Sequence, residues 1–527
     1  MKRSVLFVLT IIILAALPIA CNKQDKERLA DLKDQKAELE NEVVDLPQPT
    51  GTPSNNLSIS FDEDFYWVDA AGSVTLHYNL SIPASVEVMA EEGWNATVSS
   101  QGDREGDIVV SAPDPASPSV LRVKLTDSEG GTAETIIQML VRRPFCNVAS
   151  PRIETMAYNG FSDALATEEN FQKLVEAGIT MLSVEGDYPD LDWRKQCRLA
   201  EKYGIKVVLF IGYSAQCYYI NPGNDTRLES IVTEAEQYPA VCAYQISDEP
   251  STYMARSLAL ARRRIGELAP GHPTYINLRP SGGSVEGMAA DTYEEYVDFV
   301  VRICDLELIT FDQYPVYETG VEDEWYHALE VVSSSARNYK IPFWAFLLCC
   351  REWYRAFPSL ENIRLQGNMN LTYGAQCNQF FVWKATSGTD YAPIMNDGTY
   401  KPVYDQCKEY NRELHNREFV FAKCYVQRVR HIGNNYYLHG ASLTDADLPE
   451  AISDISSDGN AAVSFLTNNG NEYVVICNKS WQEKLPVDVT FNRTVYTIDR
   501  EGVFAVQQPG KSTFTIDEGD MLVIKWR

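Results

Sequence analysis

Apolar residues recur along residues 150–415 in two alternating patterns, short continuous runs and longer amphipathic stretches. The continuous runs predict buried strands, and the stretches, whose apolar positions repeat with a helical period, predict helices. Most of the predicted helices are followed by a Gly or Pro turn and then by the next apolar run, which is typical of βα units. The predicted strands are 154–158, 180–185, 206–212, 241–247, 274–278, 306–311, 343–348 and 379–383, and the predicted helices include 168–177, 193–203, 228–237, 254–268, 293–303 and 322–339.

Eight such units in succession predict a (β/α)8 TIM barrel, which we place at residues 146–415. A doubly wound open sheet is the alternative. It is disfavoured because the repeats are even and the region has no Gly-rich phosphate loop.

Strict alternation of polar and apolar residues flanks the barrel on both sides. It predicts an N-terminal Ig-like β-sandwich at 57–145 and a C-terminal β-sandwich at 416–527. Residues 92–113 resemble the BACON-type modules of gut-bacterial carbohydrate enzymes, which implies either glycan binding or a spacer role. Residues 472–478 and 519–524 resemble the C-terminal β-domain that follows many glycosidase barrels.

The first 21 residues have the pattern of a signal peptide, with Lys2 and Arg3 before an apolar run that is short for a membrane span. The run ends in Leu-Pro-Ile-Ala-Cys, which resembles a bacterial lipobox. The resemblance implies lipidation of Cys21 and anchoring to the outer membrane; a plain secretory signal is the alternative. Residues 22–56 predict a charged helical spacer, or a short coiled coil, and a Pro-rich linker.

Composition narrows the possible ligands. The 527 residues include 46 Lys and Arg against 73 Asp and Glu, a net charge of −27, which disfavours nucleic-acid binding. None of the six His residues are paired at metal-ligand spacing, so we expect no metal site. The sequence leaves the oligomeric state open.

Catalytic residues of such barrels lie at the C-terminal ends of the strands. The fourth strand ends in Asp248-Glu249-Pro250, which resembles the Asn-Glu-Pro motif of clan A glycosidases, with Asp in place of Asn. The resemblance implies that Glu249 is the catalytic acid of a glycoside hydrolase, a reaction that uses two carboxyl groups and requires no cofactor. Alternatively, Asp248 and Glu249 cap the next helix.

The second carboxyl group is less defined by the sequence. Clan A glycosidases carry a nucleophilic Glu at the end of the seventh strand, but residues 347–350 are apolar here and only Glu352 follows closely. Asp312, at the tip of the sixth strand, is better placed. Glu352 and Asp248 remain alternatives.

A different chemistry is also compatible with these residues. The Asp248-Glu249 pair, together with Tyr314 and Trp383, resembles the sites of substrate-assisted N-acetylhexosaminidases, in which the acetamide of the substrate attacks. In that interpretation Asp248 carries a raised pKa. A third interpretation is a carbohydrate-binding barrel that has lost its chemistry.

Other residues at the strand ends are candidates for binding a carbohydrate substrate, because sugars are held by ring faces and a few polar groups. We expect ring platforms at Trp383, Trp344 and Tyr213, and hydroxyl-binding groups at Tyr158, Asn159, Asn277 and Arg279.

Overall fold

The computed structural model describes residues 57–62, 65–69, 71–113, 119–142, 152–188, 191–221, 226–352, 355–433 and 440–527. The predicted signal peptide, Cys21 and the spacer lie outside these residues. The chain divides after Arg142 into two compact units, each of which is described by itself.

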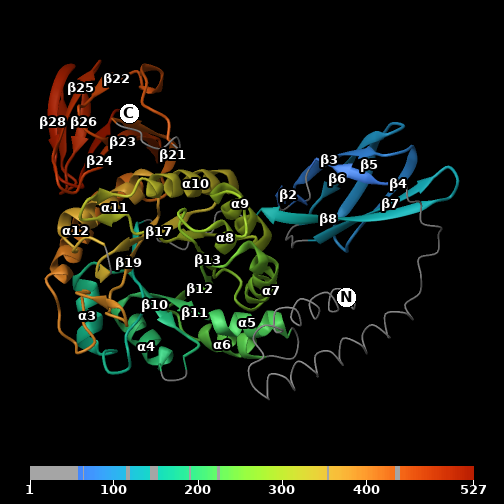
Figure 1. Ribbon diagram of the computed structural model, residues 1–527, viewed down its shortest axis with the longest axis horizontal. Helices are drawn as coiled ribbons and strands as arrows, with labels where there is room; N and C mark the ends of the chain where they lie inside the picture. The colour runs from blue at the N-terminus through green and yellow to red at the C-terminus, as the bar shows by residue number, and fades with distance from the viewer. Residues whose placement is uncertain are drawn as a thin grey trace. The chain divides into compact units, whose positions relative to one another are not determined.

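The N-terminal unit is a sandwich of two four-stranded sheets (Figure 1). Its strands alternate between buried and exposed residues, and the buried side chains of both sheets, such as Leu76, Ile108 and Val123, form one core. This confirms the predicted sandwich. One sheet has the order β1 (Ile59–Phe61), β3 (Ser73–Leu80), β6 (Glu105–Ser111), β5 (Asn95–Gln101), and the other β2 (Phe65–Asp69), β8 (Thr132–Arg142), β7 (Ser119–Asp127), β4 (Ala84–Ala90).

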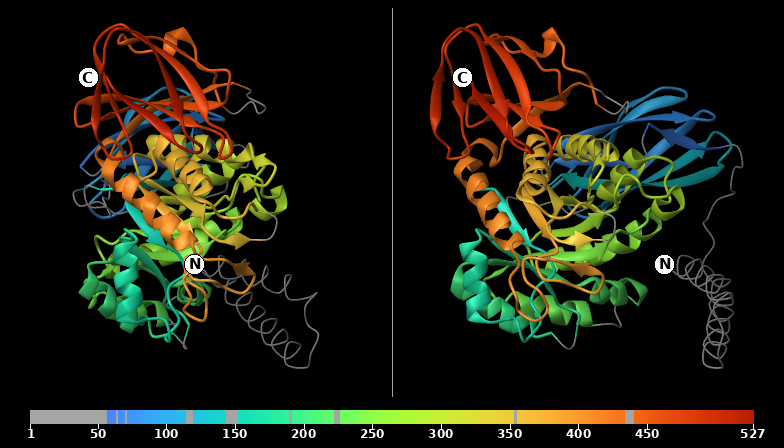
Figure 2. Two further views of the ribbon diagram at one scale, coloured as in Figure 1. Left: turned by 90° about the vertical axis from the view of Figure 1, so that its left-hand side faces the viewer. Right: turned by 60° about the vertical axis from the view of Figure 1, so that its left-hand side comes forward.

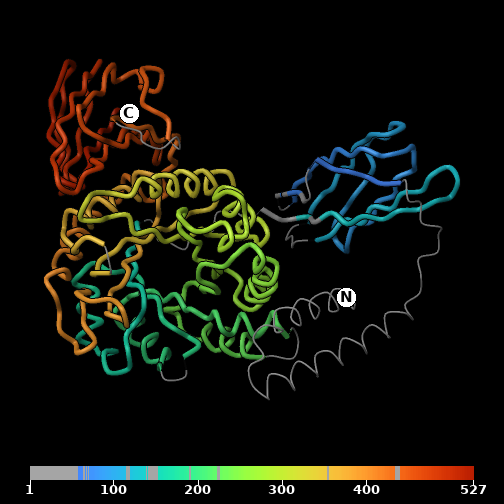
Figure 3. Tube along the Cα trace, in the orientation of Figure 1, coloured from blue at the N-terminus to red at the C-terminus, as the bar shows by residue number. Residues whose placement is uncertain are grey.

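The second unit contains the predicted barrel. Eight parallel strands close into a ring in sequence order, and the last pairs with the first (Figures 1 and 3). The strands are β9 (Glu154–Ala157), β10 (Met181–Glu185), β11 (Lys206–Phe210), β12 (Val241–Asp248), β13 (Thr274–Leu278), β14 (Ile309–Phe311), β17 (Phe343–Leu348) and β19 (Cys377–Phe381). All eight correspond to predicted strands, so the (β/α)8 fold is confirmed.

Helices surround the ring, and several begin where the sequence provides a capping side chain. The side chains of Thr167, Asp192 and Thr292 each accept a hydrogen bond from a backbone N–H of the first turn that follows. The helices are α3 (Glu168–Glu176), α4 (Trp193–Tyr203), α5 (Gly212–Ile220), α6 (Arg227–Ala235), α7 (Thr252–Leu268), α8 (Val285–Met288), α9 (Tyr293–Cys304), α10 (Glu324–Tyr339), α11 (Leu360–Thr372) and α12 (Val403–Phe421).

Two differences from the predicted elements concern residues near the strand ends. Helix α5 begins at Gly212, inside the predicted third strand, and it was not predicted because its apolar residues do not follow a helical period. The last strand, β19, ends at Phe381, two residues earlier than predicted, so Trp383 lies beyond it.

The C-terminal sandwich packs a six-stranded sheet on a three-stranded one (Figure 2), as predicted. The larger sheet has the order β21 (Tyr425–Ile432), β23 (Ala461–Asn468), β24 (Asn471–Asn478), β29 (Met521–Lys525), β26 (Val495–Ile498), β27 (Phe504–Gln507). The smaller contains β22 (Ile452–Ser456), β25 (Leu485–Phe491) and β28 (Gly510–Ile516).

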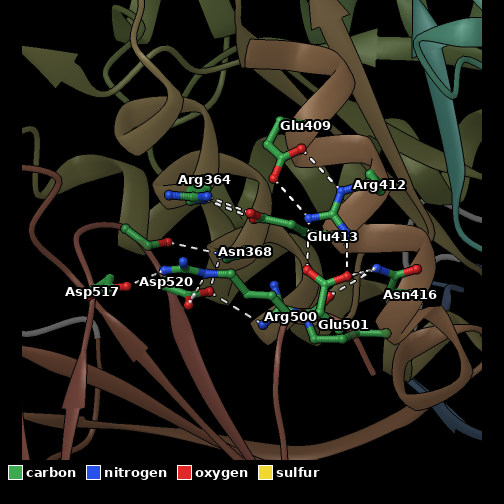
Figure 4. Close-up of polar contacts among 12 residues, drawn as sticks. Arg364, Asn368, Glu409, Arg412, Glu413, Asn416, Arg500, Glu501, Asp517 and Asp520 are labelled. Atoms are coloured by element: carbon green, nitrogen blue, oxygen red, sulfur yellow. Dashed lines mark hydrogen bonds and ion pairs between the residues drawn. The ribbon is translucent and has the colours of Figure 1, made fainter. Parts of the chain in front are cut away.

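Charged side chains join this sandwich to helix α12 of the barrel (Figure 4). Arg417, which is 1% exposed, lies 3.4 Å from Asp520 Oδ1, and Arg500 donates to the other carboxylate oxygen over 2.7 Å. Nearer the surface, Arg412 pairs with Glu501. The buried part of this network fixes the sandwich against the barrel, because separating the two would leave Arg417 without its partner.

Candidate active site

Three neighbouring strands bring Asp248, Asn277 and Asp312 together at the C-terminal end of the barrel. Asp248 is in register with Asn277, and Asn277 with Thr310. The side-chain amide of Asn277 donates to Asp248 Oδ1 and to Asp312 Oδ1, each over 2.9 Å. The two acceptor oxygens are therefore less than about 6 Å apart, since both contact the same nitrogen. Thr310 Oγ1 donates to Asn277 Oδ1 over 2.8 Å, which fixes the orientation of the amide.

Glu249 follows directly after β12 in an uncommon backbone conformation. Its φ is 44°, in the left-handed region, and its N–H donates to the carbonyl of Asn277 over 2.8 Å. The side chain is half-buried, and Oε2 lies 3.6 Å from Nη1 of Arg279. The helix that follows has Ser251 as its N-cap, so the alternative in which Asp248 and Glu249 cap this helix is wrong.

The three carboxyl groups hold protons to higher pH than isolated side chains do. Burial, followed by the charges of Glu249 and Asp248, raises the pKa of Asp312 well above its usual range, although the Asn277 hydrogen bond opposes the shift. Burial and the charge of Asp248 raise the pKa of Glu249, against Arg279. Burial also raises the pKa of Asp248, against Asn277 and Arg279. The cluster therefore retains a proton that a carboxylic acid in water would release.

A pocket of about 560 Å³ adjoins this cluster at the ends of β10, β11 and β12. Glu185, the last residue of β10, lines it, and burial together with the charges of Asp187 and Asp248 raises the pKa of Glu185 to about 7. We did not select Glu185 from the sequence. Its position in the sequence could have indicated it as a site residue, because Glu185 ends a barrel strand just as Asp248 does.

Two of the predicted binding residues, Tyr158 and Tyr314, lie beside the carboxyl groups. The negative charges of Asp248 and Asp312 contribute to raising the pKa of both phenols, after burial. Tyr314 stacks on Phe381, with ring centroids 5.1 Å apart, and Tyr158 OH accepts from Gln245 over 3.4 Å. Both phenols therefore lie close enough to Asp248 and Asp312 to be affected by their charges.

The predicted binding residues Tyr213, Asn159 and Arg279 also lie at this end of the barrel. Tyr213, on the first turn of α5, lines the pocket and is 56% exposed; Tyr188, also on the pocket, is 60% exposed. Asn159 follows β9 with a φ of 69°. Arg279 directly follows β13, and Asn277 lies within that strand, one residue before its end.

The two tryptophans do not serve as ring platforms, and this part of the prediction is wrong. Trp383 is 2% exposed and packs between Phe380 and Tyr404 of α12. Trp344 is 1% exposed and packs inside the barrel against Tyr275. Neither ring offers a face to a ligand. Trp383 is buried between the barrel strands and helix α12, and Trp344 is buried inside the barrel.

Glu352 lies apart from the three clustered carboxyl groups. It belongs to the short strand β18 (Arg351–Glu352), which pairs with β20 (Thr389–Asp390). Burial raises its pKa against the charge of Arg355, and its own charge acts on Tyr314. At the end of β17, Leu348, Cys349 and Cys350 are buried, so this strand end presents no carboxyl group.

Within the described ranges, no group of three or more His, Cys, Asp or Glu side chains is arranged to hold a metal ion. In the same part of the chain, no helix combines the length and apolarity needed to cross a membrane.

No family model matches the chain, and no curated protein matches it. Among solved structures, the chain is similar to a family 39 glycoside hydrolase from Bacteroides cellulosilyticus WH2, at 11% identity and a TM-score of 0.44, covering 89% of this chain and 100% of that one. It is also similar to a cycloisomaltooligosaccharide glucanotransferase from Paenibacillus sp., at 8% identity and a TM-score of 0.43, covering 90% and 100%. A third similar structure is a glycosyl hydrolase family 2 member from Bacteroides cellulosilyticus DSM 14838, at 9% identity and a TM-score of 0.34, covering 89% of this chain and 75% of that one.

Proposed function

We propose that this protein is a glycoside hydrolase acting on an oligosaccharide or polysaccharide, with Glu249 as the proton donor and Asp312 as the second carboxyl group. The observation that carries the proposal is the shared amide of Asn277, which holds Asp248 and Asp312 together next to Glu249. Cleavage of a glycosidic bond requires two carboxyl groups in different protonation states on either side of the bond.

One proton shared within the cluster meets this requirement. The charge of Asp248 favours a protonated Glu249. The Asn277 N–H favours an ionised Asp312 but does not offset burial, which raises the pKa of Asp312 well above its usual range, so the reactive form is the one in which the proton lies on Glu249. Glu249 then gives its proton to the departing glycosidic oxygen. Asp312 either attacks the anomeric carbon or takes a proton from the attacking water. If Asp312 attacks, water then displaces it from the anomeric carbon and gives a proton back to Glu249. If Asp312 instead takes the proton of the attacking water, that proton passes to solvent and Glu249 is reprotonated from solvent.

Leaving-group dependence tests these two roles separately. We expect Glu249→Ala to lose most activity on natural glycans but to retain activity on aryl glycosides whose leaving groups need no protonation. Asp312→Asn is expected to lose activity on both. A wild-type protein that binds glycans but cleaves none of a broad panel would overturn the proposal and support the inactive binding barrel.

A second candidate is substrate-assisted hydrolysis by Asp248 and Glu249, with the acetamide of the substrate as nucleophile. The end of β17 favours it, since buried Leu348, Cys349 and Cys350 occupy the position of the clan A nucleophile. The raised pKa of Asp248 is also compatible with it, although the cause is burial, opposed by Asn277 and Arg279. This mechanism requires a 2-acetamido group, so cleavage of a glycan with a 2-hydroxyl group excludes it.

We also propose that the protein is anchored to the outer membrane through a lipid on Cys21. The lipobox-like run that ends at this residue supports the proposal. Metabolic labelling with a radioactive fatty acid is expected to label the wild-type protein, and Cys21→Ser is expected to lose the label and move to the soluble fraction.

A further inference from the structure

The pocket beside the carboxyl cluster has a rim and a wall of different character. Its rim carries the exposed rings of Tyr188 and Tyr213, which offer flat faces of the kind that stack on sugars. Its wall carries Glu185, Asp187 and Asp248. A volume of about 560 Å³ is within the usual range for a small-molecule site.

The two acidic residues of β10 and its following turn have different tasks. Asp187 accepts hydrogen bonds from the backbone N–H groups of Tyr213 and Ser214, over 2.7 Å and 3.1 Å, and so caps the first turn of α5. Glu185 has no such structural task among the described contacts. The charges acting on it come from Asp187 and Asp248 and are both negative.

The ligand that suits this wall is one that brings a positive charge. A carboxylate or sulfate on a sugar would add a further like charge beside Glu185, Asp187 and Asp248, whereas a hydroxyl would leave their mutual repulsion unchanged. An ammonium group would replace that repulsion with a charge-assisted hydrogen bond to Glu185. The net charge of −27 attracts cationic glycans over longer distances as well.

Resting on the proposed hydrolase function, we propose that this pocket binds a sugar carrying a free amino group and that Glu185 is the specificity-determining residue that holds it. The substrate class is then a glycan with deacetylated amino sugars. The rings of Tyr188 and Tyr213 bind the sugar face, and Glu185 accepts from its ammonium group.

Calorimetric titration of the full chain carrying Glu249→Gln, which prevents turnover, tests the inference. The probes are glucosamine, N-acetylglucosamine and glucose oligosaccharides of equal length. We expect the glucosamine oligosaccharide to bind at least about tenfold more tightly than the other two, a difference typical of one charge-assisted contact. Adding Glu185→Gln is expected to remove this preference while leaving the affinity for the glucose oligosaccharide within about twofold.

The matched control is Glu201→Gln, which removes one negative charge from an exposed position on α4 and is expected to keep the preference. Retained binding of the glucose oligosaccharide shows that the Glu185→Gln variant is folded. If that variant does not fold, the same titrations are made with Glu185→Met. Equal affinity for all three probes, or a preference that survives loss of Glu185, overturns the inference.

Hydrolysis by the wild-type protein is measured separately. A protein that binds the amino sugar through Glu185 but cleaves no glycan upholds the inference and overturns the proposed hydrolase. A protein that cleaves neutral glycans but binds the glucosamine oligosaccharide no more tightly than the other probes upholds the proposed hydrolase and overturns the inference.

Discussion

Asn277 Nδ2 lies 2.9 Å from Asp312 Oδ1 and is the only hydrogen-bond donor side chain described for that carboxylate. It binds Asp248 at the same distance, so one amide sets the position of two acids on different strands. The position of Asp312, one of the two proposed reacting groups, therefore depends on the side-chain amide of Asn277, which takes no part in proton transfer.

Removing this amide should impair catalysis more than folding. We expect Asn277→Ala to lower kcat by about 10–100-fold, the range for one hydrogen bond to a charged group, because Asp312 loses the donor that favours its ionised form. The acidic limb of the pH–rate profile should move to higher pH, because Asp312 acts in its ionised form and its pKa rises further. Steady-state kinetics across pH measures both effects, and an unchanged kcat would show that the amide has no catalytic task.

The charge of Asp248 should set the pH range of activity. Because this charge raises the pKa of both Glu249 and Asp312, Asp248→Asn is expected to lower both pKa values and move the basic limb of kcat/KM to lower pH. Arg279→Met provides the opposite perturbation, since Arg279 lowers the pKa of Glu249. Shifts of the same sign in the two variants would contradict this electrostatic account.

Ionisation of Glu185 should lower the free energy of unfolding at pH values above the pKa that this carboxyl group has in the unfolded chain. A carboxyl group whose pKa rises from 4.5 to about 7 on folding favours the folded state at low pH, and this contribution is lost as pH rises towards 7. We expect Glu185→Gln to be more stable than the wild type at pH 8, by no more than about 3 kcal/mol, and the difference to vanish near pH 4. Urea unfolding at both pH values measures it, and a difference independent of pH would exclude ionisation as the cause.

The junction between the barrel and the C-terminal sandwich should depend on its buried ion pair. Arg417→Met is expected to lower the free energy of unfolding by about 3–5 kcal/mol, because it leaves Asp520 with one fewer cation in a buried place. Arg412→Met, at the exposed Glu501 pair, serves as the control and should cost about 0–1 kcal/mol. Thermal or urea unfolding of both variants measures these losses. Equal losses of unfolding free energy in Arg417→Met and Arg412→Met would show that burial of the ion pair is not the deciding factor.

The sequence by itself determined the barrel, both sandwiches and the strand-end carboxyl groups. Strands and helices were recognisable because burial imposes a period on apolar residues, and chain order alone places the strand ends at one face of a parallel barrel. Glu249 and Asp312 followed from that rule. Glu185 obeys it equally, but the charges that raise its pKa come from Asp187 and from Asp248 on another strand.

Only the tertiary structure decided which of these side chains meet and which are buried. Trp383 follows a strand just as Tyr158 does, yet it packs on Tyr404, which lies 21 positions further along the chain. The shared amide of Asn277 likewise depends on the register between β12, β13 and β14. Contacts of this kind depend on how distant segments pack, because a pattern along the chain specifies which face of an element is apolar but not which partner covers it.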